Sequence, residues 1–213
     1  ILDLGDGENR FNPSWVAAVD AALDEVEAAP VPRALVVSAT GKVWSNGLDL
    51  DWMGEHQEQI NDLLLAVHGL YARALGLGVP TVAAIQGHCF AAGAMLALAL
   101  DARIMRADRG YFCLPEADIN IPFTPGMSDL ITARLTPQAA HEAMVTARRY
   151  GGTEALAAGI VQAAVDERLV LLTAVDLARS QAGKDPATLA AIKQTSHRAT
   201  IASLRDTEAN RFG

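Results

Sequence analysis

The chain has 213 residues, of which 51% are hydrophobic and 20% are charged, and this composition excludes general disorder because it can build a sizeable core. Its formal net charge of -8 argues against a protein that tracks nucleic-acid phosphates, since such proteins carry a basic face. Cys89 and Cys113 are too few for a disulfide scaffold, and we expect neither a signal peptide nor a lipid anchor, hence a cytoplasmic protein.

Short apolar runs alternate with amphipathic stretches up to about residue 110, which predicts the β-α-β units of an α/β domain. Asn12 and Pro13 predict the start of the first helix, because Asn is a favoured N-cap and Pro a favoured first-turn residue. A second helix is expected from Ile60 to Leu75, and it stops by Pro80. Strands are expected at residues 1–4, 34–38 and 81–85.

Residues 81–100 carry no formal charge, so a membrane span has to be considered. The polar tripeptide at residues 86–88 interrupts the run near its middle, and no belt of arginine and lysine flanks it. A strand, a turn and a buried helix explain the run better. We therefore expect no membrane association.

Beyond about residue 125 the pattern becomes mainly helical. Helices are expected at residues 124–135, 137–148, 153–158, 166–183 and 186–208. We expect an α/β core over residues 1–150 and a helical C-terminal region over residues 151–213 that serves assembly. The helix at 166–183 presents an apolar face that either lies between subunits or packs on the chain's own core. That face consists of Leu171, Ala174, Val175 and Ala178.

Two common site motifs are absent from the sequence. A phosphate-binding loop at Gly41-Lys42 would need a glycine at position 36 and a hydroxyl residue at position 43, and valines occupy both. The five histidines lack the spacing of metal ligands, so we expect them to face solvent or to cap helices, and we predict no metal.

Two turns, each following an expected strand, can present backbone amides to a ligand. The segment at residues 45–49 presents the amide of Leu48, and the segment at residues 86–93 presents that of Ala92 or Gly93 at a helix N-terminus. Each turn alone is equally explained by a plain Asn-Gly turn or by tight packing of a helix on a sheet. Together they predict an oxyanion hole.

Glu116 lies in an unusual setting for a carboxylate. Its neighbours in sequence are mostly apolar, namely Leu114, Pro115, Ile119, Ile121 and Phe123. Glu116 is either an exposed loop residue or a desolvated carboxylate whose raised pKa suits a general base.

The two turns and the segment around Glu116, in this order and at these separations, resemble the crotonase superfamily, the enoyl-CoA hydratase/isomerase family. Residues 44–49 (WSNGLD) match the family's FSAG-x-D element, and residues 87–93 match G-x-x-x-GGG with alanine in place of the first two glycines of the triplet. Residues 115–119 match its PE-x-x-(I/L) element, and residues 152–161 resemble its A-x-x-A-x-x-x-GLV segment. The resemblance implies a crotonase-like ββα spiral core with a C-terminal helical layer that forms trimers or dimers of trimers and closes the CoA pocket.

The resemblance also implies a chemistry. The amides of Leu48 and Ala92 would bind the thioester oxygen of an acyl-CoA substrate and stabilise its enolate, with no cofactor beyond the CoA of the substrate. The family's hydratases use two glutamates, whereas here Met95 stands at the first position and Glu116 keeps the second. One base suffices to take a proton from C2 of a 3-enoyl-CoA and return it at C4, as in Δ3,Δ2-enoyl-CoA isomerases. Further substrate contacts are expected from Trp44, Asn46, Gly47, Phe90, Gly93, Met95 and Phe123.

Asp51 departs from the family pattern, because several members have a basic residue there for the CoA phosphates. Arg10 and Lys42 are the candidates that remain for this role. The leading hypothesis is an isomerase acting on unsaturated fatty acyl-CoA. The alternatives are a hydratase, an acyl-CoA decarboxylase or hydrolase, and a catalytically idle homologue that binds CoA esters or a partner.

Overall fold

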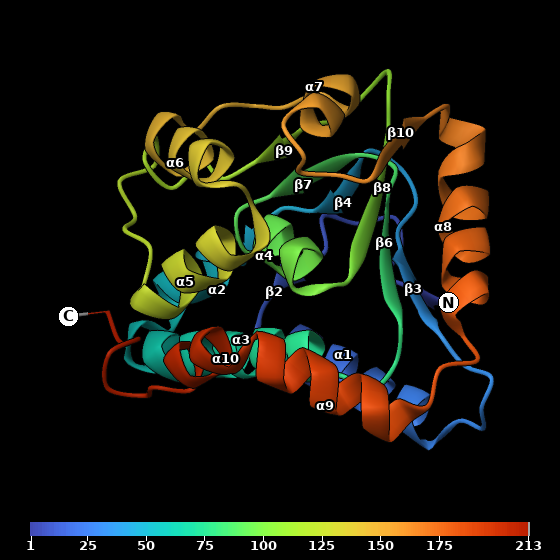
Figure 1. Ribbon diagram of the computed structural model, residues 1–213. Helices are drawn as coiled ribbons and strands as arrows, with labels where there is room; N and C mark the ends of the chain where they lie inside the picture. The colour runs from blue at the N-terminus through green and yellow to red at the C-terminus, as the bar shows by residue number, and fades with distance from the viewer. Residues whose placement is uncertain (213) are drawn as a thin grey trace.

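Five parallel strands form the central sheet of the molecule (Figure 1), whose computed structural model describes residues 1–212. In spatial order they are β1 (Leu2–Asp3), β3 (Leu35–Ser38), β6 (Thr81–Ile85), β8 (Ala102–Arg106) and β10 (Ala163–Val165). The register pairs Val37 with Ala83, and Ala84 with Ile104. Every residue of β3 and β6 is buried, as is usual for parallel strands that are covered on both faces.

Two smaller parallel ladders adjoin this sheet. One contains β4 (Val43–Ser45), β7 (His88–Phe90) and β9 (Phe112–Cys113), and the other pairs β2 (Arg10–Phe11) with β5 (Gly47–Leu48). The carboxyl ends of neighbouring parallel strands lie at the same edge of a sheet, which is where ligand sites of open α/β folds form. The residues that follow β7 and β9 are therefore close together, and the contacts of α4 with β5 bring β5 to the same place.

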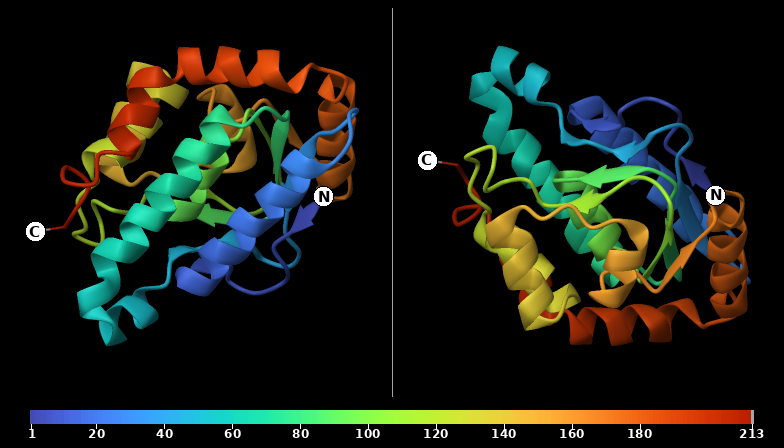
Figure 2. Two further views of the ribbon diagram at one scale, coloured as in Figure 1. Left: turned by 90° about the horizontal axis from the view of Figure 1, so that it is seen from below. Right: turned by 90° about the horizontal axis from the view of Figure 1, so that it is seen from above.

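Helices cover the sheets from several sides (Figures 1 and 2). The long helices α1 (Pro13–Ala28) and α3 (Ile60–Gly76) lie side by side, and α8 (Glu167–Gln181) packs on β3, β6 and β8. Helix α4 (Ala92–Ala99) is buried along its whole length. The remaining helical segments are α2 (Leu50–Glu55), the 3-10 turn η1 (Gln57–Gln59), α5 (Pro125–Arg134), α6 (Pro137–Thr146), α7 (Gly152–Ala157), α9 (Pro186–Ser196) and α10 (Arg198–Leu204).

Two arginines hold the C-terminal end of α4. Arg103 donates hydrogen bonds to the carbonyl oxygens of Ala97 (3.3 Å) and Leu100 (3.1 Å). Arg134 donates to those of Leu98 and Leu100, both at 2.8 Å. The last carbonyls of a helix have no partner within the helix and carry partial negative charge, so both cations stabilise this end.

The structure confirms the expected α/β class and most of the expected elements. The Asn12 side chain caps α1 by accepting a hydrogen bond from the Trp15 amide at 3.0 Å. The expectation of a single helix over residues 186–208 is wrong, because the chain leaves helical geometry at His197 (φ -105°, ψ 17°), between α9 and α10. Strand β10 was also not expected, since residues 163–165 are a short run between two helical patterns.

The region beyond residue 150 also contributes to the central sheet, through β10 and through the cover that α8 provides. On α8, Ala174 and Ala178 are buried against the chain's own strands, whereas Leu171 is 42% exposed. The expected face is thus divided between the core and the surface, and the expected division of the chain at residue 150 stays a prediction. Among residues 1–212, no helix combines the length and apolar character needed to cross a membrane.

Candidate active site

Three predicted pieces meet at one cavity of about 200 Å³. Leu48 comes from β5, Ala92 is the first residue of α4, and Glu116 follows β9. The contacts between elements explain the meeting, because α4 packs against both β5 and β7, and β7 pairs with β9. The other lining residues are Asn46, Leu50, Phe90, Ala91, Met95, Pro115, Ile119, Ile121, Pro122, Met127 and Phe212.

The amide of Ala92 belongs to the first turn of α4, which lines this cavity. Ala91 has a positive φ of 50° and lies just before α4, and its carbonyl accepts the first helical bond from the Met95 amide (3.0 Å). The amides of the first helical turn have no partner within a helix. The Ala92 amide is therefore available to a ligand, and the positive end of the helix dipole favours negative charge there.

Gly47 allows the backbone of β5 to approach this helix start. Its φ is +83°, and a Cβ atom at this position would lie 2.8 Å from the Ala92 nitrogen and 3.0 Å from the Phe90 oxygen. A side chain at position 47 would thus collide with the backbone that presents the amide. Glycine is required here both for its conformation and for the close approach that sets Leu48 beside Ala92.

Glu116 is a buried carboxylate. It is only 5% exposed, and among the described residues its Oε2 atom has no hydrogen-bond partner. Burial raises the pKa of Glu116 to about 7, against the opposing effect of a backbone hydrogen bond. A tight turn fixes its position: the Pro115 carbonyl accepts from the amide of Asp118 (2.9 Å), and the Glu116 carbonyl from that of Ile121 (3.1 Å).

Met95 makes the opposite part of the wall apolar. It lies three residues beyond Ala92 on α4, hence on the same face of the helix, and it is 1% exposed. Of the described residues that line the cavity, Glu116 is the one that bears a charge. The cavity therefore combines the backbone at Leu48 and Ala92, one carboxylate of raised pKa and otherwise uncharged walls.

Sequence reasoning missed Tyr71 of α3. Its hydroxyl donates a hydrogen bond to the Ala92 carbonyl at 2.8 Å and thereby holds the start of α4. Burial, with a smaller contribution from the negative charge of Glu116, raises the pKa of Tyr71 well above its usual value. Tyr71 is completely buried and lies on the apolar face of α3 together with Leu64 and Val67. A tyrosine on such a face needs a buried hydrogen-bond partner for its hydroxyl. The position of Tyr71 in this apolar pattern could therefore have indicated a structural role.

His68 lies three residues before Tyr71 and is also completely buried, so the expectation that the histidines face solvent or cap helices is wrong for this residue. Its Nδ1 lies 2.5 Å from the Leu64 carbonyl and its Nε2 lies 2.7 Å from Thr124 Oγ1. A neutral imidazole satisfies both contacts by donating from Nδ1 and accepting at Nε2. Burial lowers the pKa of His68, which agrees with this state. Thr124 in turn caps α5, so His68 anchors the far end of the segment that begins at Glu116.

Four residues expected to contact substrate are not part of the cavity wall: Gly47, whose role is the close backbone approach described above, and Trp44, Gly93 and Phe123. Trp44 is fully buried in the core, where its indole nitrogen lies 3.4 Å from the Val37 carbonyl. Gly93 faces β4, and a Cβ atom there would be 2.6 Å from the Cβ of Ser45. Phe123 is half-buried and packs against the main core. Large apolar side chains beside a buried strand gain more from the core than from a solvent-connected cavity.

The two candidates for binding CoA phosphates also lie outside the wall. Arg10 forms ion pairs with Glu8 (2.5 Å) and Asp51 (2.6 Å), and the hydrogen bond to Asp51 is the main cause of its raised pKa. Lys42 is exposed on the turn before β4. Arg10 is thus already neutralised by carboxylates, and its role toward CoA stays a prediction, as does that of Lys42.

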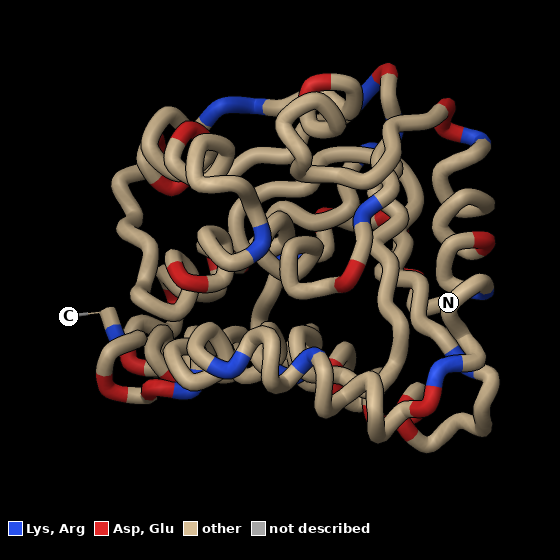
Figure 3. Tube along the Cα trace, viewed as in Figure 1, with Lys and Arg blue, Asp and Glu red and all other residues tan. Residues whose placement is uncertain are grey.

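Charged groups elsewhere give no second chemical centre. Acidic and basic residues are interspersed along the chain rather than gathered in a basic stripe (Figure 3). Within residues 1–212, no three His, Cys, Asp or Glu side chains are grouped as metal ligands would be.

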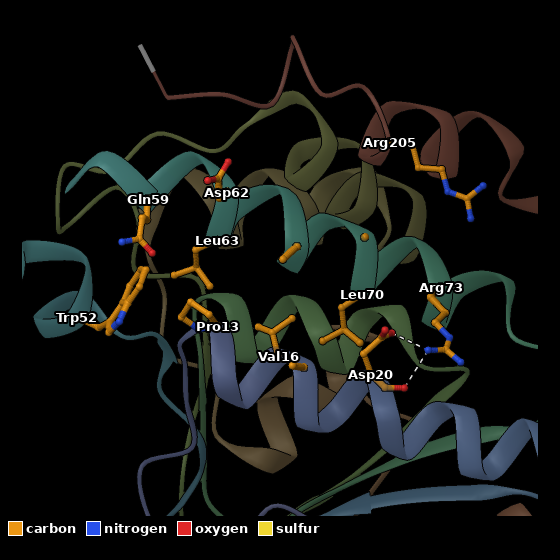
Figure 4. A pocket seen from close by; sticks show the side chains of 13 residues that line it. Pro13, Val16, Asp20, Trp52, Gln59, Asp62, Leu63, Leu70, Arg73 and Arg205 are labelled. Carbon is orange, nitrogen blue, oxygen red and sulfur yellow. Dashed lines mark hydrogen bonds and ion pairs between the residues drawn. The ribbon is translucent and has the colours of Figure 1, made fainter. Parts of the chain in front are cut away.

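A larger hollow of about 620 Å³ lies between α1 and α3 (Figure 4). Its walls include Val16 and Leu70, and Arg73 there donates a 2.7 Å hydrogen bond to Asp20. This hollow contains neither the paired amides nor a buried carboxylate. The smaller cavity is therefore the candidate active site.

Comparisons with known proteins identify relatives over most of the chain. Residues 3–211 match the family model described as enoyl-CoA hydratase/isomerase. The chain is 35% identical over 190 residues to the peroxisomal enoyl-CoA delta isomerase 2 of Arabidopsis thaliana, which spans 84% of this chain and 79% of that protein. It is 31% identical over 207 residues to a putative enoyl-CoA hydratase of Thermus thermophilus, which spans 91% and 78%. An apo structure of a Mycobacterium tuberculosis enoyl-CoA isomerase superposes with a TM-score of 0.89 at 29% identity, over 96% of this chain and 89% of that one.

Proposed function

Because the chain belongs to the enoyl-CoA hydratase/isomerase family and has its crotonase-like fold, we propose that it is an isomerase that converts 3-enoyl-CoA to 2-enoyl-CoA. In this proposal Glu116 is the single acid and base, and the amides of Leu48 and Ala92 form the oxyanion hole. The observation that carries the proposal is the lone carboxylate: Glu116 is the charged residue among the described cavity residues, with Met95 in the wall on α4.

The reaction follows from these positions. The Glu116 carboxylate takes a proton from C2, and the electron pair of that C–H bond moves into a dienolate whose negative charge lies mainly on the thioester oxygen. Two fixed amides stabilise this oxygen, and a preorganised donor of this kind contributes about 3–4 kcal/mol. The Glu116 carboxylic acid then returns the proton to C4, the electrons shift back, and the double bond lies between C2 and C3.

The raised pKa of Glu116 supports this role. A general base is most effective when its pKa lies near the working pH, and burial brings the pKa of Glu116 to about 7. Each turnover begins and ends with the same carboxylate, so no further proton donor is required. The apolar surroundings also limit the access of water, which would otherwise add to C3 of the 2-enoyl product.

The relatives bear on the choice between isomerase and hydratase. The Arabidopsis relative is described as an isomerase and the Thermus relative as a putative hydratase, so the family alone does not separate the two activities. Hydration is best served by two carboxylates that hold and activate one water molecule. Met95 removes one of the two positions, which favours isomerisation.

The experiment that tests the proposal supplies the purified protein with 3-enoyl-CoA and, separately, with 2-enoyl-CoA. Conjugation of the first substrate and loss of conjugation in the second are followed by ultraviolet absorbance. We expect rapid conjugation and slow hydration. Faster hydration than isomerisation would show that the argument from Met95 is wrong, and absence of both reactions with retained acyl-CoA binding would indicate an idle homologue.

A further inference from the structure

A thin wall separates the active-site cavity from a second hollow. The second hollow has a volume of about 600 Å³, against about 200 Å³ for the active-site cavity. Three residues, Ile121, Pro122 and Phe212, line both spaces. Ile121 and Pro122 belong to the segment that follows Glu116, whereas Phe212 comes from the C-terminal end of the described chain. Their side chains are therefore what divides one continuous space into two.

Hydrogen bonds fix Phe212 in this wall. Its amide donates to Asn61 Oδ1 at 2.9 Å, and Asn61 Nδ2 donates to its carbonyl at 3.3 Å, which ties the segment to α3. Two residues earlier, the completely buried Asn210 accepts from the Gly126 amide (2.8 Å) and donates to the Ser203 carbonyl (2.6 Å). The ring of Phe212 is thus held in place by its own backbone.

The second hollow, called the outer hollow below, suits a hydrocarbon chain better than it suits the charged half of a CoA ester. Met53 of α2 and Ile60 of α3 add apolar surface to the shared wall. The polar lining comes from neutral side chains, Gln57, Asn61 and Asn120. No charged side chain of residues 1–212 lines this hollow, so phosphate groups would find no counter-ion in it.

The volume of the inner cavity limits what can bind without the outer one. A group the size of a water molecule takes up about 30 Å³ in a liquid, so about 200 Å³ holds some six or seven such groups. This is room for the thioester carbonyl and about five further carbons. A longer chain stays buried beyond this point only if it passes the wall.

We infer that Phe212, together with Ile121, is a specificity-determining residue that closes the acyl pocket and restricts the enzyme to short-chain acyl-CoA substrates. The inference rests on the proposed function for the location of the thioester. Removal of the ring joins the two spaces and admits longer chains into the outer hollow.

The test measures dissociation constants for saturated acyl-CoAs of four to twelve carbons, and kcat/KM for 3-enoyl-CoAs of six to twelve carbons. In the wild type we expect both to stop improving at about six carbons. In Phe212→Ala, each additional buried methylene should tighten binding by up to about fourfold, so that the twelve-carbon ester gains at least about tenfold over the wild type. The four-carbon ester should bind equally well to both proteins.

A second variant and a control keep the outcome clear. Ile121→Ala opens the same wall from the other side and should produce the same shift even where Phe212→Ala loosens the C-terminal segment. Leu172→Ala, at a 55% exposed position on α8, should change nothing. An equal dependence on chain length in the wild type and both wall variants overturns the inference.

The two proposals fail in different ways. If the protein isomerises 3-enoyl-CoA but neither wall substitution changes its dependence on chain length, the closed wall is refuted and the proposed function is unaffected. If saturated esters bind with the expected cut-off, and Phe212→Ala removes this cut-off, but no isomerisation occurs, the wall is supported and the proposed function is refuted. Saturated esters make this separation possible because their binding requires no turnover.

Discussion

Replacement of Glu116 by glutamine is the most direct probe of the proposed mechanism, because it removes the base at nearly constant size. A general base contributes about 100-fold to 10,000-fold to a rate, so we expect Glu116→Gln to lose isomerisation by at least about 100-fold. Acyl-CoA binding should persist, since the amides of Leu48 and Ala92 are unchanged. The measurement is the initial rate of conjugation of 3-enoyl-CoA.

The pH dependence gives the same experiment a second readout. The carboxylate is the reactive form and its pKa is about 7, so wild-type kcat/KM should rise about tenfold per pH unit below pH 7 and level off above it. The residual activity of Glu116→Gln should lack this transition.

Stability should move in the opposite direction from activity. Burial raises the pKa of Glu116 from 4.5 to about 7, so the folded protein holds this proton more tightly than the unfolded chain does. The wild type therefore loses stability as the pH rises from about 4.5 to about 7, by about 3 kcal/mol at about 1.4 kcal/mol for each pH unit. Glutamine does not titrate and has no such loss. The free energy of unfolding of Glu116→Gln minus that of the wild type, as measured by urea unfolding, should therefore be up to about this amount larger at pH 8 than at pH 4.5.

Asp118→Asn is the matched control, since it neutralises an exposed carboxylate two residues away in the same turn. It should leave both the rate and the pH profile unchanged. Glu116→Gln with an isomerisation rate within tenfold of the wild type would refute the assignment of the base.

Three further predictions test the rest of the site. Met95→Glu restores a second carboxylate and should confer measurable hydration of 2-enoyl-CoA, with raised apparent pKa values in its pH profile because two like charges share an apolar cavity. Gly47→Ala should lower kcat by about 100-fold, because its Cβ atom would collide with the Ala92 amide. Gly159→Ala has a similar positive φ but open space around it, so it should only destabilise the fold by about 1 kcal/mol. Equal activity losses in the two variants would contradict this geometry. We also expect a trimer or a dimer of trimers, and a monomeric mass in analytical ultracentrifugation at micromolar concentration would rule this out.

The sequence predicts the fold where several local signals agree. Asn12 followed by Pro13 marks the start of α1, and cap and periodicity point to the same place. The break at His197 was not predictable in this way, because the apolar pattern continues on both sides and the break reflects the packing of α10 on α3 and α5. Strand β10 was missed for a related reason: three residues become a strand only because β8 offers an unpaired edge.

The residues of the candidate site that belong to sequence motifs were predictable. Leu48 ends β5, Ala92 starts the helix after β7 and Glu116 follows β9, and all three line one cavity. Tyr71 and Phe212 carry no motif, and their positions depend on contacts between segments distant in the sequence, such as the bonds between Asn61 and the backbone of Phe212. Trp44 and Phe123 lie in or near motifs, yet their size and apolar character draw them into the core.

The clamp that Arg103 and Arg134 place on α4 has a consequence for how the specificity of such an enzyme can change. An eight-residue helix is about 12 Å long, and here two arginines hold its far end, while in the proposed function its near end binds the negative oxygen. The part of the site proposed to stabilise charge thus belongs to a helix that is buried along its whole length. Glu116 and Phe212 lie instead on a turn and on a terminal segment. Mutation can therefore alter which proton moves, or which chain fits, without disturbing the helix that every reaction of this kind requires.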